Sequence, residues 1–247
     1  MICSEGCTGE QAAFLECRID PFRTGLRNMS IDRELLHRAE ASTGPMTWVR
    51  LYGWHPPAVS IGSHQDPETA VAAQVCALRG IDIVRRPTGG RAVFHDREVT
   101  YAVVSNDPVL VGGGITAAYR RVAEALQAGL RAVGVETQMA RGEPAPEGTG
   151  PGSHPCFASA SRHELLVEGR KIAGSAQRRL RRAFLQHGSI PLQIDYPLMA
   201  DLLGCSEAFL RRRMISVSEA AGRPVSFREL AESLQAAFRE RFGLGSG

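Results

Sequence analysis

The chain has 247 residues and a formal net charge of +3, with 43% hydrophobic and 22% charged residues, a composition that excludes wholesale disorder. It contains neither an apolar run near the roughly 18 residues of a membrane-spanning helix nor a secretory signal at its N-terminus. Because the charge is also too small to imply nucleic acid, we expect a cytoplasmic protein that binds neither membrane nor nucleic acid.

The first half of the chain is predicted to alternate helices and strands. Residues 1–17 are expected to form a flexible lead-in, and a helix is predicted at 28–42, where Met29, Leu35 and Leu36 recur at helical spacing. A second helix is predicted at 66–80, with Asp66 as N-cap, Pro67 at the first helical position and Gly80 as its stop. Strands are predicted at 47–54, 58–62 and 81–86, and in 91–105 as two strands around a tight turn at 95–98.

The second half is predicted to begin with a long amphipathic helix at 115–134 that Gly134 ends. Residues 141–155 are rich in Pro and Gly and are expected to form a mobile surface loop. A hairpin at 163–177 that turns at Glu168 and Gly169, and a strand at 183–192, come next. The remainder, 196–247, is predicted to be largely helical, with Ser226 and Glu229 as a capping-box pair.

The order of these elements favours a single catalytic domain at 18–247, because no repeat or linker divides the chain. Adjacent strands mix with flanking helices, which is typical of an α+β (α/β-like) fold with one mixed β-sheet flanked by helices.

The six cysteines are scattered, with no CxxC pair. We therefore expect neither a disulfide framework nor a structural zinc site. We expect free thiols in a reducing cytoplasm. His154, Cys156 and His163 fit no zinc spacing, so we expect no metal.

Lysine usage is unusual, because 28 of the 29 basic residues are Arg and the other is Lys171. A GC-rich coding bias explains why lysine is scarce, but not where the one lysine stands. Arg cannot act as an amine, whereas Lys has a compact, titratable head. The count therefore favours a chemical role for Lys171, against the alternative of accident, and excludes a Walker A loop, which needs its own lysine.

Three segments carry candidate chemistry. In RRPTGGRAVFHD (85–96) the two glycines permit close backbone approach, and Arg86 and Arg91 favour an anionic or carbonyl-rich ligand; the alternative is an ordinary hairpin turn. Cys156 follows the Pro/Gly loop as a candidate nucleophile, the alternative being a small apolar residue at a strand start. Lys171 would favour the thiolate if it lay beside Cys156, the alternative being a strand lysine that points to solvent.

Basic runs at 178–182 and 211–213 are usually solvated faces, although here they could also dock an acidic protein partner.

Together, NMSIDRELL, RRPTGGRAVFHD and ELLVEGRKIAGSAQRR…LQHGSIPL resemble the catalytic domain of the biotin/lipoate protein ligase superfamily over about residues 14–240. Within it, the chain is most similar to the cysteine-loop (LipM-like) octanoyltransferases. Like them it has RRPTGGR, where the ATP-dependent lipoate ligases have GGG. It also has a Cys-Phe pair 15 residues before the lysine of GRKIAGSAQ.

The resemblance implies a fold, a reaction and a site. The fold would be a mixed sheet flanked by helices. Cys156 would form an acyl thioester, and Lys171 would lower its pKa. The donor would be octanoyl-acyl carrier protein and the acceptor a lipoyl-domain protein such as glycine cleavage H protein, with no cofactor. Residues expected to line the acyl and carrier-arm site are Arg86, Gly89, Gly90, Arg91, His95, Gly174, Ser175 and Ala176.

Two alternatives remain open. An ATP-dependent lipoate ligase usually carries an added C-terminal domain, for which the roughly 55 residues after GSIPL are too few, and it needs no cysteine at position 156. A non-catalytic carrier-protein binding module would form nothing covalent. The chain also departs from the family in its shorter, Arg-rich tail and its Pro/Gly-rich loop, which leaves partner docking open.

Overall fold

The computed structural model describes residues 14–140 and 164–243. In this part of the chain the main sheet has five strands, in the order β1-β2-β6-β11-β10. β1 and β2 are parallel, and the other neighbouring pairs are antiparallel, so the predicted mixed sheet is confirmed. The strands are β1 (Phe14–Ile19), β2 (Met46–Tyr52), β6 (Glu98–Ser105), β10 (Gly174–Arg179) and β11 (Phe184–Pro191).

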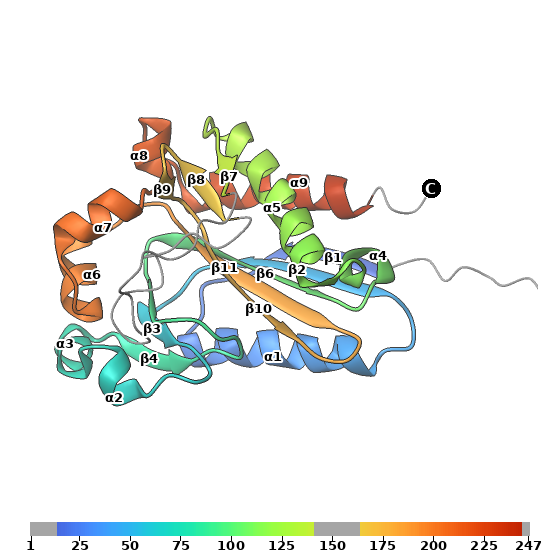
Figure 1. Ribbon diagram of the computed structural model, residues 1–247, viewed down its shortest axis with the longest axis horizontal. Coiled ribbons are helices and arrows are strands. Elements are labelled where there is room, and N and C mark those ends of the chain that lie inside the picture. The colour runs from blue at the N-terminus through green and yellow to red at the C-terminus, as the bar shows by residue number, and fades with distance from the viewer. Residues whose placement is uncertain (1–13, 141–163, 244–247) are drawn as a thin grey trace, which may run out of the picture.

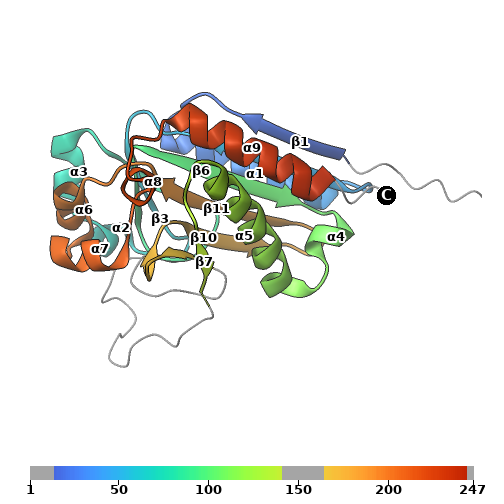
Figure 2. The same cartoon turned by 90° about the horizontal axis from the view of Figure 1, so that it is seen from above.

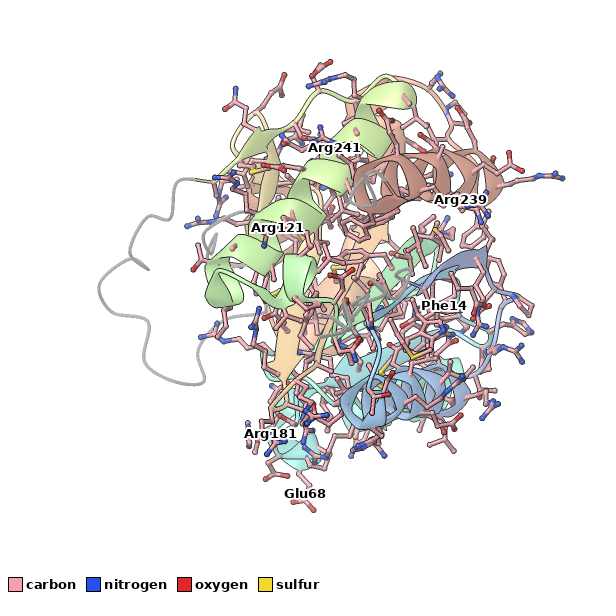
Figure 3. The ribbon with its side chains drawn as sticks, turned by 90° about the vertical axis from the view of Figure 1, so that its right-hand side faces the viewer. Phe14, Glu68, Arg121, Arg181, Arg239 and Arg241 are labelled. Atoms are coloured by element: carbon pink, nitrogen blue, oxygen red, sulfur yellow. The ribbon has the colours of Figure 1, made fainter. Side chains whose placement is uncertain are left out.

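Both faces of this sheet are covered by helices (Figures 1 and 2). Because successive strand residues point to opposite faces, Val49 packs in one apolar cluster with residues of α5 (Gly114–Ala132) and α9 (Phe227–Gly243). Its neighbour Trp48 packs in another cluster, with residues of α1 (Gly25–Ala41). Figure 3 shows α1 on one side of the sheet and α5 and α9 on the other, with Arg121 and Arg241 labelled on these two helices. Burial on both faces explains why every residue of β6 is buried.

The long helices form where the spacing of apolar residues predicts them, with local signals at their ends. Thr24 caps α1 by accepting a hydrogen bond from the backbone N–H of Arg27 at 3.3 Å. α5 stops before Gly134, which has a φ of +88°. The α5–α9 contact requires Gly129, because a Cβ there would lie 2.6 Å from Cδ2 of Leu234.

Within the described residues, two smaller sheets accompany the main one. The first has the order β4-β3-β5 and the second the order β7-β8-β9. Their strands are β3 (Ala58–Ile61), β4 (Asp82–Arg85), β5 (Val93–His95), β7 (Gln138–Met139), β8 (Leu165–Val167) and β9 (Arg170–Lys171). The remaining helices are α2 (Pro67–Ala70), α3 (Ala73–Arg79), α4 (Pro108–Val111), α6 (Tyr196–Leu203), α7 (Glu207–Arg213) and α8 (Val217–Ala221).

The helix predicted at 66–80 is wrong as one element, because it breaks between α2 and α3. Val71 is extended, at φ −151° and ψ 157°, and its side chain is buried in the cluster that includes Leu202 of α6. The next residue, Ala72, donates its backbone N–H to the carbonyl of Leu202 at 3.1 Å. Tertiary contacts therefore replace the helical hydrogen bonds at this point.

Three further features differ from the prediction: the start of β1, the pairing of β5, and the capping box at Ser226 and Glu229. Residues 14–17, expected in the lead-in, belong to β1. β5 and β6 do not pair with each other in the described structure: β5 pairs with β3, and β6 pairs with β2 and β11. Ser226 accepts the backbone N–H of Glu229 at 3.1 Å, but the Glu229 carboxylate bonds the side chain of Arg223.

The helical C-terminal part is confirmed, and so is the hairpin turn, where Glu168 and Gly169 have φ of 50° and 76°. The loop at 141–155, together with Cys156 and His163, lies outside the described residues. Within 14–140 and 164–243, no helix is both long and apolar enough to cross a membrane, and no cluster of side chains suited to a metal ion occurs.

Candidate functional site

A pocket with about 420 Å³ of empty space, including its opening to solvent, lies between the main sheet and the β4-β3-β5 sheet. Of the predicted substrate-binding residues, the lining includes Arg86, His95, Gly174, Ser175 and Ala176, and the other lining residues are Met29, Tyr52, Trp54, Ser60, Val93, Thr100, His187, Gly188 and Ser189. Gly89, Gly90 and Arg91 lie on the adjoining turn and are not part of this lining.

Arg86 stabilises the RRPTGGR turn. Its guanidinium is buried, and all three nitrogens donate to protein oxygens, including the carbonyls of Gly89 at 2.8 Å, Arg91 at 2.7 Å and Ser60 at 2.9 Å. Gly90 has a φ of 95°, which favours glycine. The turn thus depends on Arg86 for its shape, and substrate contact by Arg86 stays a prediction.

His95 belongs to a buried hydrogen-bond network beside the pocket. Its Nδ1 lies 2.8 Å from Oε1 of Glu98, and its Nε2 lies 2.7 Å from Oγ of Ser60. Glu98 also accepts hydrogen bonds from Thr100 and Ser189. The two ring nitrogens of His95 thus hold Glu98 on one side and Ser60 on the other.

The ring of Trp54 stacks on His95, with centroids 4.1 Å apart and planes inclined by 13°. The Trp54 indole N–H donates to Thr100 at 2.7 Å. The polar atoms of this wall therefore bond one another, while ring carbon faces the cavity.

A second network links His187 of β11, which also lines the pocket, to α1. His187 Nδ1 lies 3.0 Å from Oδ2 of Asp32, and His187 Nε2 lies 2.7 Å from Oγ1 of Thr88 in the RRPTGGR turn. Asp32 also pairs with Arg50 and accepts the hydroxyl of Tyr52.

Burial and pairing set the charges of this network. Burial alone would raise the pKa of Asp32, but the hydrogen bond from His187 and the charge of Arg50 outweigh it and lower that pKa. Burial, together with the charges of Arg86 and His95, outweighs the effect of Asp32 and lowers the pKa of His187. A neutral His187 therefore donates to Asp32 and accepts the Thr88 hydroxyl, which anchors the turn to the sheet.

Lys171 is buried, with its side chain 4% exposed, so the alternative of a solvent-facing lysine is wrong. Its Nζ donates to Oε1 of Glu164 at 2.6 Å, and the Glu164 side chain is also 4% exposed. Burial raises the pKa of Tyr101 to about 12, with a smaller contribution from Glu164. The Tyr101 hydroxyl lies 2.6 Å from Oγ of Ser175 in the pocket lining, so the charge of Glu164 acts on a side chain that contacts this lining.

Sequence reasoning missed Glu164, although a signal for it existed. The predicted turn at 168–169 places residues 164–166 opposite 171–173, and a buried lysine needs an acidic neighbour. Cys156 lies outside the described residues, so its position relative to Lys171 stays a prediction.

Two arginines of the first basic run contact neighbouring segments, whereas residues 211–213 are exposed. Arg178 donates to the carbonyl of Pro87 at 3.1 Å. Arg179 donates to the carbonyl of Gly114 at 2.9 Å and lies over the Phe184 ring. These two arginines therefore hold β10 against neighbouring segments.

Comparison with known proteins places this fold in a family. The lipoyl protein ligase A/B catalytic domain matches residues 24–239. Octanoyltransferase LipM of Symbiobacterium thermophilum is 41% identical over 232 residues, which cover 90% of this chain and 84% of that protein. Octanoyltransferase LipM of Bacillus subtilis is 36% identical over 231 residues, covering 88% and 81%.

Solved structures agree on the fold. A bipartite lipoate protein ligase from Thermoplasma acidophilum superposes with a TM-score of 0.71 at 23% identity, covering 94% of this chain and 84% of that one. Lipoate-protein ligase A bound with ATP gives 0.68 at 24% identity, covering 94% and 85%. The superfamily resemblance and the fold class expected from the three motifs are thus confirmed, and this chain belongs to the lipoyl protein ligase A/B catalytic domain family.

Proposed function

We propose that this chain is a cytoplasmic octanoyltransferase of lipoate biosynthesis, which moves an octanoyl group from acyl carrier protein to a lysine of a lipoyl-domain protein through a thioester on Cys156. The observation that carries the proposal is the pocket of about 420 Å³, in a chain 41% identical to an octanoyltransferase. In the described part of the chain, no side chain that lines the pocket has a buried nitrogen or oxygen without a hydrogen-bond partner. Such a pocket can take a hydrocarbon chain without leaving polar groups unpaired.

The first half-reaction exchanges one thioester for another. The Cys156 thiolate attacks the octanoyl carbonyl, a new C–S bond forms, and the C–S bond to the carrier breaks. The carrier thiolate leaves and takes up a proton. Because a thioester replaces a thioester, the step is near neutral in free energy and needs no ATP.

The second half-reaction forms the stable product. The neutral amine of the acceptor lysine attacks the acyl-enzyme, an amide bond forms, and Cys156 leaves as a thiolate, while the proton lost by the amine restores the thiol. This step is downhill, since an amide is more stable than a thioester.

In this proposal Lys171 stabilises the Cys156 thiolate, and Glu164 positions Lys171. An ammonium close to a thiol favours the thiolate. The Lys171 ammonium donates a hydrogen bond to the Glu164 carboxylate at 2.6 Å, which holds the lysine head group in place. Glu164 is thus a positioning residue that acts through Lys171.

Intact mass spectrometry tests the proposal. Incubation with octanoyl-acyl carrier protein, without ATP, is expected to add one octanoyl group that hydroxylamine removes. The adduct is expected to be absent in Cys156→Ala and present in the control Cys205→Ala, which removes a half-buried thiol that is not part of the pocket lining. Transfer that requires ATP and free lipoate and survives Cys156→Ala would instead establish the lipoate ligase activity. The absence of any covalent adduct and any transfer would establish the binding module.

A further inference from the structure

The pocket between the sheets reaches α1, where Met29 contributes to its lining. The Met29 side chain is buried, at 3% exposure. Met29 packs in the same apolar cluster as Tyr52 and Trp54, which also line the pocket.

A second hollow lies on the outer side of α1. This groove between α1 and β4 has about 1180 Å³ of empty space and opens to solvent, and its lining includes Leu26, Met29, Ser30 and Val84. Among residues 14–140 and 164–243, Met29 is the one residue that lines both the pocket and the groove. At this point the wall between the two spaces is one side chain thick.

Gly25 shows how closely this part of α1 is packed. A Cβ at Gly25 would lie 2.9 Å from Cγ1 of Val84 and 3.1 Å from Cζ3 of Trp54. Residues four apart share one helix face, so Trp54, which lines the pocket, and Val84, which lines the groove, meet α1 beside Met29. Beside Met29, Trp54 and Val84 therefore close the wall between the pocket and the groove. Met29 is the side chain whose truncation would open this wall.

We propose that Met29 forms the end of the acyl pocket and sets the longest acyl chain that the enzyme transfers. The inference rests on the proposed function, since it takes the pocket as the acyl site. Met is unbranched and adaptable, so it can close against the end of an octanoyl chain, whereas extra methylenes meet it directly. A mismatch of one methylene in an apolar pocket changes selectivity by roughly 10- to 200-fold.

The test compares carriers loaded with octanoyl, decanoyl and dodecanoyl groups. Wild-type enzyme is expected to prefer octanoyl over dodecanoyl by at least about tenfold, and Met29→Ala is expected to lower this ratio by about tenfold or more, because the longer chain can extend into the groove. Met29→Val, a smaller change, keeps the test open if Met29→Ala does not fold.

Two variants of Leu26, which lies 75% exposed in the groove, serve as controls. Leu26→Ala alone is expected to leave the chain-length profile unchanged. Leu26→Asp added to Met29→Ala places a charge where extra methylenes would emerge, so it is expected to reverse the gain for dodecanoyl and to leave octanoyl transfer as it was.

The outcomes separate this inference from the proposed function. Octanoyl transfer by wild type with an unchanged chain-length profile in folded Met29→Ala and Met29→Val overturns the role of Met29 alone. Wild-type protein that transfers no acyl chain overturns the proposed function, and the assignment of the pocket with it.

Discussion

The Lys171–Glu164 pair gives the sharpest test of the chemistry, because its structural and chemical contributions can be separated. The two charged atoms are 2.6 Å apart and each side chain is 4% exposed. Lys171→Met or Glu164→Leu alone leaves a buried charge without this partner, which costs about 3–5 kcal/mol. At roughly 2–4 °C per kcal/mol for a domain of this size, the expected fall in melting temperature is about 6–20 °C.

The double variant Lys171→Met/Glu164→Leu removes both charges and is expected to regain wild-type stability, because apolar replacement of a buried ion pair is often neutral or stabilising. It is nevertheless expected to form no octanoyl-enzyme, since no ammonium remains to favour the thiolate. Thermal unfolding and intact mass are the two measurements. The exposed pair Arg131–Glu136, whose side chains are 65% and 74% exposed, is the control, and its double variant is expected to change neither.

A stable double variant that acylates at the wild-type rate would refute the reasoning, because the lone lysine would then have no chemical role. Lys171→Arg adds a test of shape, since it keeps the charge and alters the head group. Wild-type rates in that variant would also contradict the argument from the single lysine of the chain.

Two further predictions concern the walls of the pocket. Burial lowers the folded-state pKa of His187, so the unfolded chain binds more protons than the folded one as the pH falls through an unfolded pKa of about 6.5. In urea titrations the stability of the wild type is therefore expected to decrease as the pH is lowered from about 7.5 to about 5.5. The decrease is expected to be smaller in His187→Gln and unchanged in the exposed control His37→Gln. An equal pH slope in His187→Gln would contradict a neutral, buried His187. Gly188→Ala would place a Cβ 2.3 Å from the carbonyl oxygen of Gly174 and should cost about 1–3 kcal/mol, whereas Gly89→Ala, with nothing within 4 Å of a Cβ, should leave the melting temperature unchanged.

Local patterns predicted most elements of the fold. The apolar spacing of α1, the capped start at Asp66 and the turn at Glu168 and Gly169 are signals within a few residues of one another, and the structure contains all three. The break at Val71 was not predictable in this way, because it depends on Leu202, more than a hundred positions away. The pairing of β5 with β3, and not with β6, could not be predicted for the same reason, because it joins segments that are distant in the sequence.

In the site, too, contacts between residues close in the sequence could be predicted, and contacts between distant residues could not. Glu98 lies three residues from His95, and Glu164 lies seven from Lys171 across a predicted turn, so both partners could have been found from the sequence. Asp32 and His187 are 155 positions apart and meet only because α1 packs under the sheet. Arg86 was predicted as a ligand contact from its charge, yet its nitrogens bond protein oxygens.

These pairings bear on how one fold can serve both ligases and transferases. A pocket whose polar groups bond one another selects its ligand by shape, since it keeps no unpaired donor or acceptor with which to reject a related chain. Octanoyl and lipoyl groups have similar shapes, so such a pocket separates them poorly. The choice between a thioester donor and an ATP-activated one must then be made by residues outside this wall, and our proposal assigns it to Cys156 and to the buried Lys171–Glu164 pair. Substitutions in the wall should change which chain is held, and substitutions in the ion pair should change whether any chain is transferred.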